Sequence, residues 1–106
     1  MTGKETSRTA NVAHFEELQG RLRGLLSMVA PHLPAVTVQL VAEMIDANEC
    51  GVALETVSEM LGESRSAISA DVLAIVSELT TALHLPGVNV ERLRPLVTSA
   101  GDDDAQ

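Results

Sequence analysis

The chain has 106 residues and a formal net charge of −8, and 45% of its residues are apolar. This length suits one small domain, while the negative charge disfavours binding to nucleic-acid phosphates and favours basic partners. Phe15 is the only aromatic residue, so the core has to be built from aliphatic side chains, which favours helices over strands.

The cysteine content and the polarity of the two ends indicate where the protein resides. Cys50 is the only cysteine, which excludes an internal disulfide and is typical of a reducing compartment. The first residues lack the apolar stretch of a signal peptide, and no apolar run is long enough to span a membrane. We therefore expect a soluble, cytoplasmic protein with a disordered segment (1–10), one helical domain (11–97) and an acidic disordered tail (98–106).

Apolar residues at helical spacing predict a first helix from about Val12 to Val29, with Asn11 as its N-cap. Pro31 and Pro34 end it. Its inward face is expected to carry Val12, Phe15, Leu18, Leu22, Leu25, Leu26 and Val29.

A second helix is predicted from about Ala35 to Ala47. Its inward face is expected to carry Val36, Leu40, Val41, Met44 and Ile45, and its outward face Gln39, Glu43 and Asp46. A third helix, from about Val52 to Leu61, follows a turn at Asn48–Gly51, and Gly62 is the residue expected to end it.

A fourth helix is predicted from about Ala70 to Leu83, with Ser69 as its N-cap. Its inward face is expected to carry Val72, Ile75, Val76, Leu79 and Leu83. Asn89 is the expected cap of a final turn, Val90–Leu93, which Pro95 limits in length. The predicted fold class is therefore all-α, a small bundle of four helices plus a short fifth helical turn.

The stretch from Glu55 to Val76 has the spacing of a helix-turn-helix, so a DNA-binding transcriptional regulator that reads DNA through Ser64–Asp71 is the alternative function. A recognition helix should present basic or amide side chains at its start. Residues 35–80 contain eight acidic residues and a single basic one, Arg65. Because DNA affinity depends on Lys and Arg contacts to phosphates, we expect this protein not to bind nucleic acid.

The acidic residues gather in the second and third predicted helices and the turn between them. Glu55, Glu59 and Glu63 follow one another at intervals of four, a spacing at which like charges destabilise a helix by a few tenths of a kcal/mol. A solvated surface is the simplest interpretation of each acid taken singly. Together they favour a basic protein partner, and the residues predicted to contact it are Glu43, Asp46, Glu49, Glu55, Glu59 and Glu63.

The run MIDANECGVALETVSEMLGE, Met44–Glu63, resembles the core of the Maf-type immunity proteins. In that family a helix is followed by a Glu-x-Gly-x-Ala-Leu-Glu turn-and-helix and a Leu-x-Glu end. The matching positions here are Glu49, Gly51, Ala53, Leu54, Glu55, Leu61 and Glu63. The following run AISADVLAIVSELTTALHL is similar to the family's next helix, so the resemblance covers about residues 36–97.

The resemblance implies an immunity protein of a bacterial polymorphic toxin or contact-dependent growth inhibition system. Such a protein binds the C-terminal domain of its cognate toxin and blocks the active site or the entry of substrate. Many of these toxins are nucleases with basic clefts, which an acidic helical hairpin could cover. A helical adaptor for an unrelated basic partner is a third possibility.

Residues that could support catalysis are few. His14, His32 and His84 lie in different predicted elements and share no metal-ligand spacing with Cys50. A helix start would lower the pKa of the Cys50 thiol, whereas Glu49 beside it would raise this pKa, and a structural role is expected. The chain has no Gly-rich phosphate loop and no Gly-x-Ser-x-Gly motif. We expect no enzymatic activity, no cofactor and no bound metal.

Overall fold

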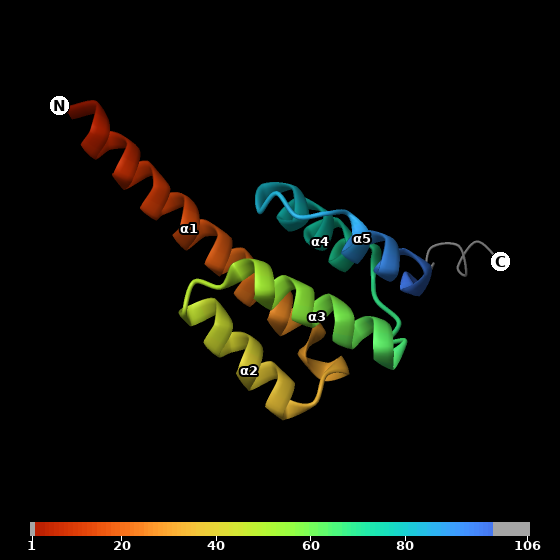
Figure 1. The fold of residues 1–106 in the computed structure, drawn as a ribbon. Helices are drawn as coiled ribbons and strands as arrows, with labels where there is room; N and C mark the ends of the chain where they lie inside the picture. The colour runs from red at the N-terminus through yellow and green to blue at the C-terminus, as the bar shows by residue number, and fades with distance from the viewer. Residues whose placement is uncertain (1, 99–106) are drawn as a thin grey trace.

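The computed structural model describes residues 2–98, and the side chains from His14 onwards, so the predicted acidic tail lies almost wholly outside the described residues. Within this range the chain forms an all-α bundle of four helices and a short fifth, which confirms the predicted fold class (Figure 1). The elements are α1 (Thr2–Val29), η1 (Ala30–His32), α2 (Ala35–Asp46), α3 (Cys50–Ser64), α4 (Ala70–Ala82), α5 (Val88–Leu93) and η2 (Arg94–Leu96), where η denotes a 3-10 helix.

Helix α1 is the central element of the bundle. It contacts α2, α3 and α4, and in Figure 1 its N-terminal half projects beyond all of them. The helix begins at Thr2 and not near Val12, so residues 2–10, predicted to be disordered, are helical. These residues contain no proline, and a helix that is already nucleated adds one hydrogen bond for each further residue it orders.

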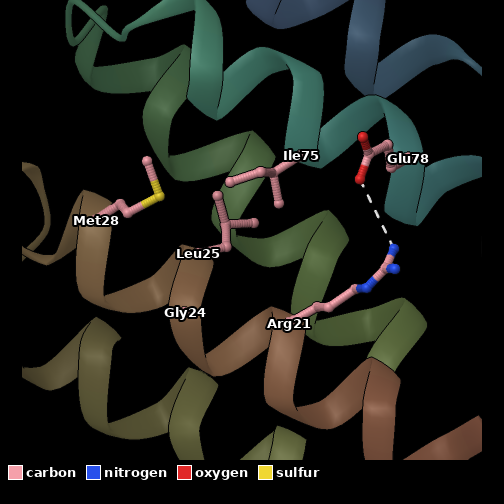
Figure 2. Close-up of a pocket in the computed structure, with 6 residues that line it drawn as sticks. All are labelled: Arg21, Gly24, Leu25, Met28, Ile75 and Glu78. Carbon is pink, nitrogen blue, oxygen red and sulfur yellow. Dashed lines mark ion pairs between the residues drawn. The ribbon is translucent and has the colours of Figure 1, made fainter.

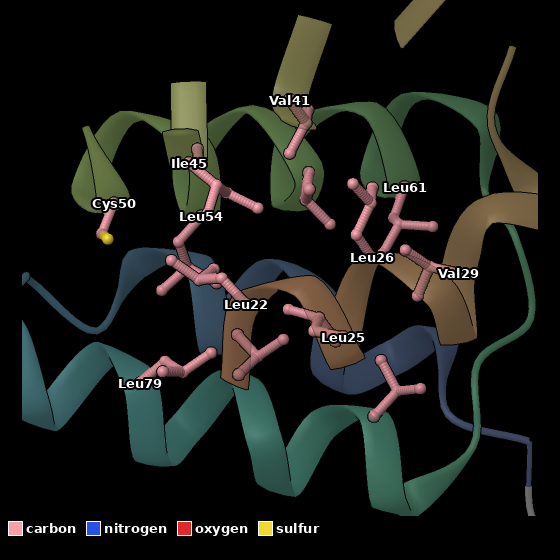
Figure 3. Close-up of a cluster of buried hydrophobic side chains, with 14 of the residues drawn as sticks. Leu22, Leu25, Leu26, Val29, Val41, Ile45, Cys50, Leu54, Leu61 and Leu79 are labelled. Carbon is pink, nitrogen blue, oxygen red and sulfur yellow. The ribbon is translucent and has the colours of Figure 1, made fainter. Parts of the chain in front are cut away.

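The core is aliphatic, and α1 contributes five of the side chains that were predicted to face it. Leu22 and Leu25 lie between the side chains of the α2–α3 hairpin and Leu79 of α4 (Figure 3). Phe15 was expected in this core and is 45% exposed, because it precedes Leu18, the first of the described α1 side chains that is buried. The buried side chains of α1 are Leu18, Leu22, Leu25, Leu26 and Val29.

The predicted rotation of α2 about its axis was partly wrong. Val36 and Leu40 were expected inward and are 74% and 47% exposed. The residues that α2 buries are Thr37, Val41 and Ile45. Apolar residues occupy several sides of this helix, so its hydrophobic pattern does not determine which side faces α1.

Three helices end in a left-handed residue, and none of the three is glycine. The residues are Asn48 (φ 63°), Arg65 (φ 53°) and His84 (φ 58°). Gly51 and Gly62, predicted to form the turn before α3 and its end, both lie inside α3. Each left-handed residue belongs to a Schellman motif, in which the next N–H bonds back to the last helical turn. These bonds run from Glu49 to Met44 (2.8 Å), from Ser66 to Leu61 (3.2 Å) and from Leu85 to Thr80 (2.9 Å).

Helix α4 begins as predicted, because the Ser69 hydroxyl accepts a hydrogen bond of 3.2 Å from the Val72 N–H. Asn89, in contrast, does not cap the last helix. It lies inside α5 at 2% exposure, and Gly87 occupies the N-cap position. Beyond α5, the Ile68 N–H bonds to the Leu96 carbonyl (3.0 Å), which ties the α3–α4 connection to the end of the bundle.

Replacing His84 by glycine is expected to raise the free energy of unfolding by about 1 kcal/mol, because a left-handed backbone costs most residues about 1–2 kcal/mol and glycine almost nothing. Denaturant unfolding monitored by circular dichroism measures the change. His32→Gly is the control, since His32 is also exposed and has no positive φ. A His84→Gly protein less stable than the parent would contradict the prediction.

Candidate functional site

The predicted contact residues all lie on the surface of one helical hairpin. Glu43 and Asp46 are on α2, Glu49 is in the turn, and all three are exposed. Helix α3 presents the other three acids, likewise exposed, on successive turns of one face: Glu55, Glu59 and Glu63. No Lys or Arg occurs between Ala35 and Ser64. The hairpin therefore presents six exposed carboxylates and no basic side chain of its own.

Two arginines from other helices modify this surface, and the sequence pattern did not reveal them. Arg23 of α1 forms an ion pair of 2.7 Å with Asp46. Arg92 of α5 lines a surface hollow of about 400 Å³ together with Glu59, Glu63 and Gly62. Both arginines lie far along the chain from the acids, so only the folded arrangement brings them together.

Gly62 has a structural role that differs from the predicted one. A Cβ atom at this position would lie 2.8 Å from Cδ and 3.0 Å from Cγ of Arg92. Because Gly62 has no side chain, the aliphatic part of Arg92 can pack directly against α3 at this position. The Arg92 Nη1 donates a hydrogen bond of 3.2 Å to Oδ1 of Asn89. This places one guanidinium group beside the C-terminal acids of α3.

Glu49 is the N-cap residue of α3, but it makes no side-chain capping hydrogen bond. Its carboxylate thus accepts no hydrogen bond from the N–H groups at the start of this helix. The turn that precedes α3 uses the left-handed Asn48 and not Gly51. The Glu49 carboxylate therefore remains exposed with the other acids of the hairpin.

The helix-turn-helix alternative gains no support from the geometry of α3 and α4. The five residues 65–69 connect the two helices, whereas the usual turn of this motif has three or four residues. Helix α4 contains no Lys or Arg, and Asp71 and Glu78 are exposed on it. A helix with this surface would repel the phosphates that flank a DNA groove.

A second hollow, of about 420 Å³, lies between α1 and α4 (Figure 2). Leu25, Met28 and Ile75 give it an apolar lining, with Gly24 on α1. At one end the guanidinium of Arg21 lies 3.7 Å from the Glu78 carboxylate. A single exposed ion pair beside aliphatic side chains is not an arrangement of acid, base and nucleophile.

The described residues contain no cluster of His, Cys, Asp and Glu suited to a metal ion. His14, His32 and His84 are all exposed. Burial raises the pKa of the Cys50 thiol, and the nearby Arg23 guanidinium lowers it to a smaller extent. Burial, and not the charge of Glu49, is thus the main influence on this thiol.

Comparison with known proteins gave no match to a family model, a curated protein or a solved structure. None of the helices within residues 2–98 combines the length and the apolar character needed to cross a membrane.

At neutral pH, Cys50 of the folded protein is expected to react with iodoacetamide at least about tenfold more slowly than Cys50 of the unfolded chain, because the thiolate is the reactive form. Burial raises its pKa, so the reaction should accelerate only as the pH rises above the range of an ordinary thiol. Mass spectrometry of alkylated protein follows the rate. Arg23→Gln should slow the reaction further, and equal rates in folded and unfolded protein would contradict the prediction.

Glu55→Gln is expected to raise the free energy of unfolding by a few tenths of a kcal/mol at low ionic strength, because it removes a like-charge pair with Glu59. The gain should disappear at about 1 M salt, where the screening length falls to about 3 Å. Thermal unfolding at both salt concentrations measures it. Glu16→Gln is the matched control, since Val12 and Gly20 lie four residues on either side of Glu16.

Proposed function

We propose that this protein is a cytoplasmic immunity protein that binds and neutralises the C-terminal domain of a cognate bacterial toxin. It acts by stoichiometric binding, catalyses no reaction and needs no cofactor. The α2–α3 hairpin covers a basic active-site or substrate cleft of the toxin. The observation that carries the proposal is the exposure of all six hairpin acids on a segment without Lys or Arg.

The charge distribution favours a basic partner over a merely solvated surface. Among the ion pairs of residues 14–98, Asp46 is the one hairpin acid that takes part. An exposed pair of this kind contributes about 0–1 kcal/mol, and the other five acids keep their charge available. Complementary charge on a partner would speed association and align the two surfaces.

The choice of a toxin domain as the partner depends on the resemblance of Met44–Glu63 to the Maf-type immunity proteins. The acidic surface by itself supports any basic partner, including one bound by an adaptor. Among toxin activities we favour a nuclease, because a cleft that binds phosphates also attracts carboxylates. The hairpin would then occupy the cleft by presenting the charge of the substrate.

Co-expression with the toxin domain encoded by the adjacent upstream gene tests the proposal. We expect this domain to arrest growth when expressed alone, and growth to be restored with this protein. The two proteins should then co-purify at a one-to-one ratio. A neighbouring domain that is harmless, or a toxic one that this protein neither binds nor neutralises, would overturn the proposed function.

Replacing Glu55, Glu59 and Glu63 together by glutamine is expected to weaken toxin binding by about tenfold or more at low salt, because close interfacial charge pairs are worth about 1.5 kcal/mol or more. The dependence of the dissociation constant on salt should decrease at the same time. Isothermal titration calorimetry at several salt concentrations measures both effects.

The matched control for this triple variant replaces Glu16, Glu17 and Glu78, which are exposed on α1 and α4. It changes the net charge by the same amount on elements outside the hairpin, so the affinity should fall much less. Equal losses from the two triple variants would show that net charge, and not the hairpin, attracts the partner.

A further inference from the structure

The same hairpin carries an apolar seam, which we define as Val36, Leu40 and Met44 on α2 with Val52, Thr56 and Met60 on α3. On each helix these residues recur every four positions, so they form one line along the helix. Exposure is 74% at Val36, 47% at Leu40 and 48% at Val52. The other three are half-buried.

The two lines face each other across the hairpin. The Thr56 hydroxyl donates to the Met44 sulfur over 3.7 Å, which fixes the register of α2 against α3. The two helices of the hairpin run in opposite directions (Figure 1). One helical turn before Met44 on α2 therefore corresponds to one turn after Thr56 on α3, which places Leu40 opposite Met60. The seam therefore runs along the junction of the two helices and extends over about 12 Å between Val36 and Met44 at 1.5 Å per residue.

Acidic side chains border the seam on both helices. Glu43 follows Leu40 by three positions on α2, and on α3 Glu55 follows Val52 and Glu63 follows Met60 in the same way. Residues three apart lie on neighbouring parts of a helix surface, so each carboxylate projects beside an apolar side chain. All three acids are exposed, and the surface is apolar along its middle and negative at its edges.

We propose that the seam binds a cationic amphipathic helix of the protein partner, whose apolar face packs on Leu40 and its neighbours while its Lys and Arg residues meet the bordering acids. Two antiparallel helices offer a third helix a straight apolar track, as in helix-in-groove recognition. Met44 and Met60 can adapt to the packing of the partner, because the methionine side chain is flexible and polarisable.

The charge of the border selects this occupant. An anionic lipid surface or a nucleic acid would meet the carboxylates of Glu43, Glu55 and Glu63 and be repelled. A neutral apolar helix could cover the seam but would bury these carboxylates without a partner, at a cost in desolvation. A helix with a basic border satisfies both the apolar and the charged parts of the surface.

This inference depends on the proposed function only in taking the hairpin as the binding surface, and it can be tested with the full chain and synthetic peptides. The first peptide has about 18 residues, with Leu along one helical face and Lys along the other, a length of about five turns. The second has the same composition, reordered so that no apolar face forms. The third keeps the apolar face and replaces Lys by Glu.

Fluorescence anisotropy of the labelled peptides measures binding. We expect the first peptide to bind at least about tenfold more tightly than the second and the third not to bind. Equal affinity for the first two peptides would show that charge alone attracts them, and binding of the third would show that the acidic border has no selective effect. Absence of binding by the first peptide would also overturn the inference.

The variant Val36→Gln/Leu40→Gln should weaken binding of the first peptide by about tenfold and leave the salt dependence unchanged, because the acids are retained. Val88→Gln is the matched control, since Val88 is 54% exposed on α5 and outside the seam. Circular dichroism verifies that each variant is folded. Equal affinities of the double variant and the control would contradict a role for the seam.

The toxin complex separates this inference from the proposed function. If the double glutamine variant binds and neutralises the toxin as well as the parent does, the seam is not the contact, although the protein remains an immunity protein. If the peptides and variants behave as expected but no neighbouring toxin is neutralised, the proposed function fails and the seam remains a binding site for cationic helices.

Discussion

The packing of one face of α1 between the α2–α3 hairpin and α4 is the interaction on which the remaining structure depends. Leu22, Leu25 and Val29 are each 1% exposed, and Leu22 and Leu25 lie between the side chains of the hairpin and Leu79 of α4 (Figure 3). Full burial of one such side chain contributes about 1.5–3 kcal/mol. Because α1 buries the inner face of the hairpin, the opposite face of the hairpin is left for the acids and the apolar seam.

The order of the helices and the approximate bounds of α2, α3 and α4 were predictable, because their apolar residues recur at the helical period and Ser69 is a standard N-cap. The rotation of α2 was not, since apolar residues lie on both its inner and outer sides. The left-handed residues that terminate these helices were missed for another reason. Asn48, Arg65 and His84 adopt the left-handed conformation in positions where glycine is usual, and the glycines nearest to two of them, Gly51 and Gly62, lie inside α3.

The exposure of the six hairpin acids was predictable from the sequence, but the residues that surround them in the fold were not. Intervals of four placed Glu55, Glu59 and Glu63 on one face of a helix, and all three are exposed there. The pairing of Asp46 with Arg23 and the position of Arg92 come from contacts between distant segments. The apolar seam was missed because Val36 and Leu40 were assigned to the core, where most residues of these types are found.

The α2–α3 hairpin combines two physical properties that would serve a partner in different ways. Its carboxylates act over distances of about 8–10 Å in ordinary salt, so they influence the rate and orientation of approach. Leu40 and Val36 act only on contact, where removal of apolar surface from water slows dissociation. Repulsion among the acids lowers the stability of the free protein, and a basic partner would relieve it on binding. The same residues would therefore destabilise the free hairpin slightly and stabilise the complex.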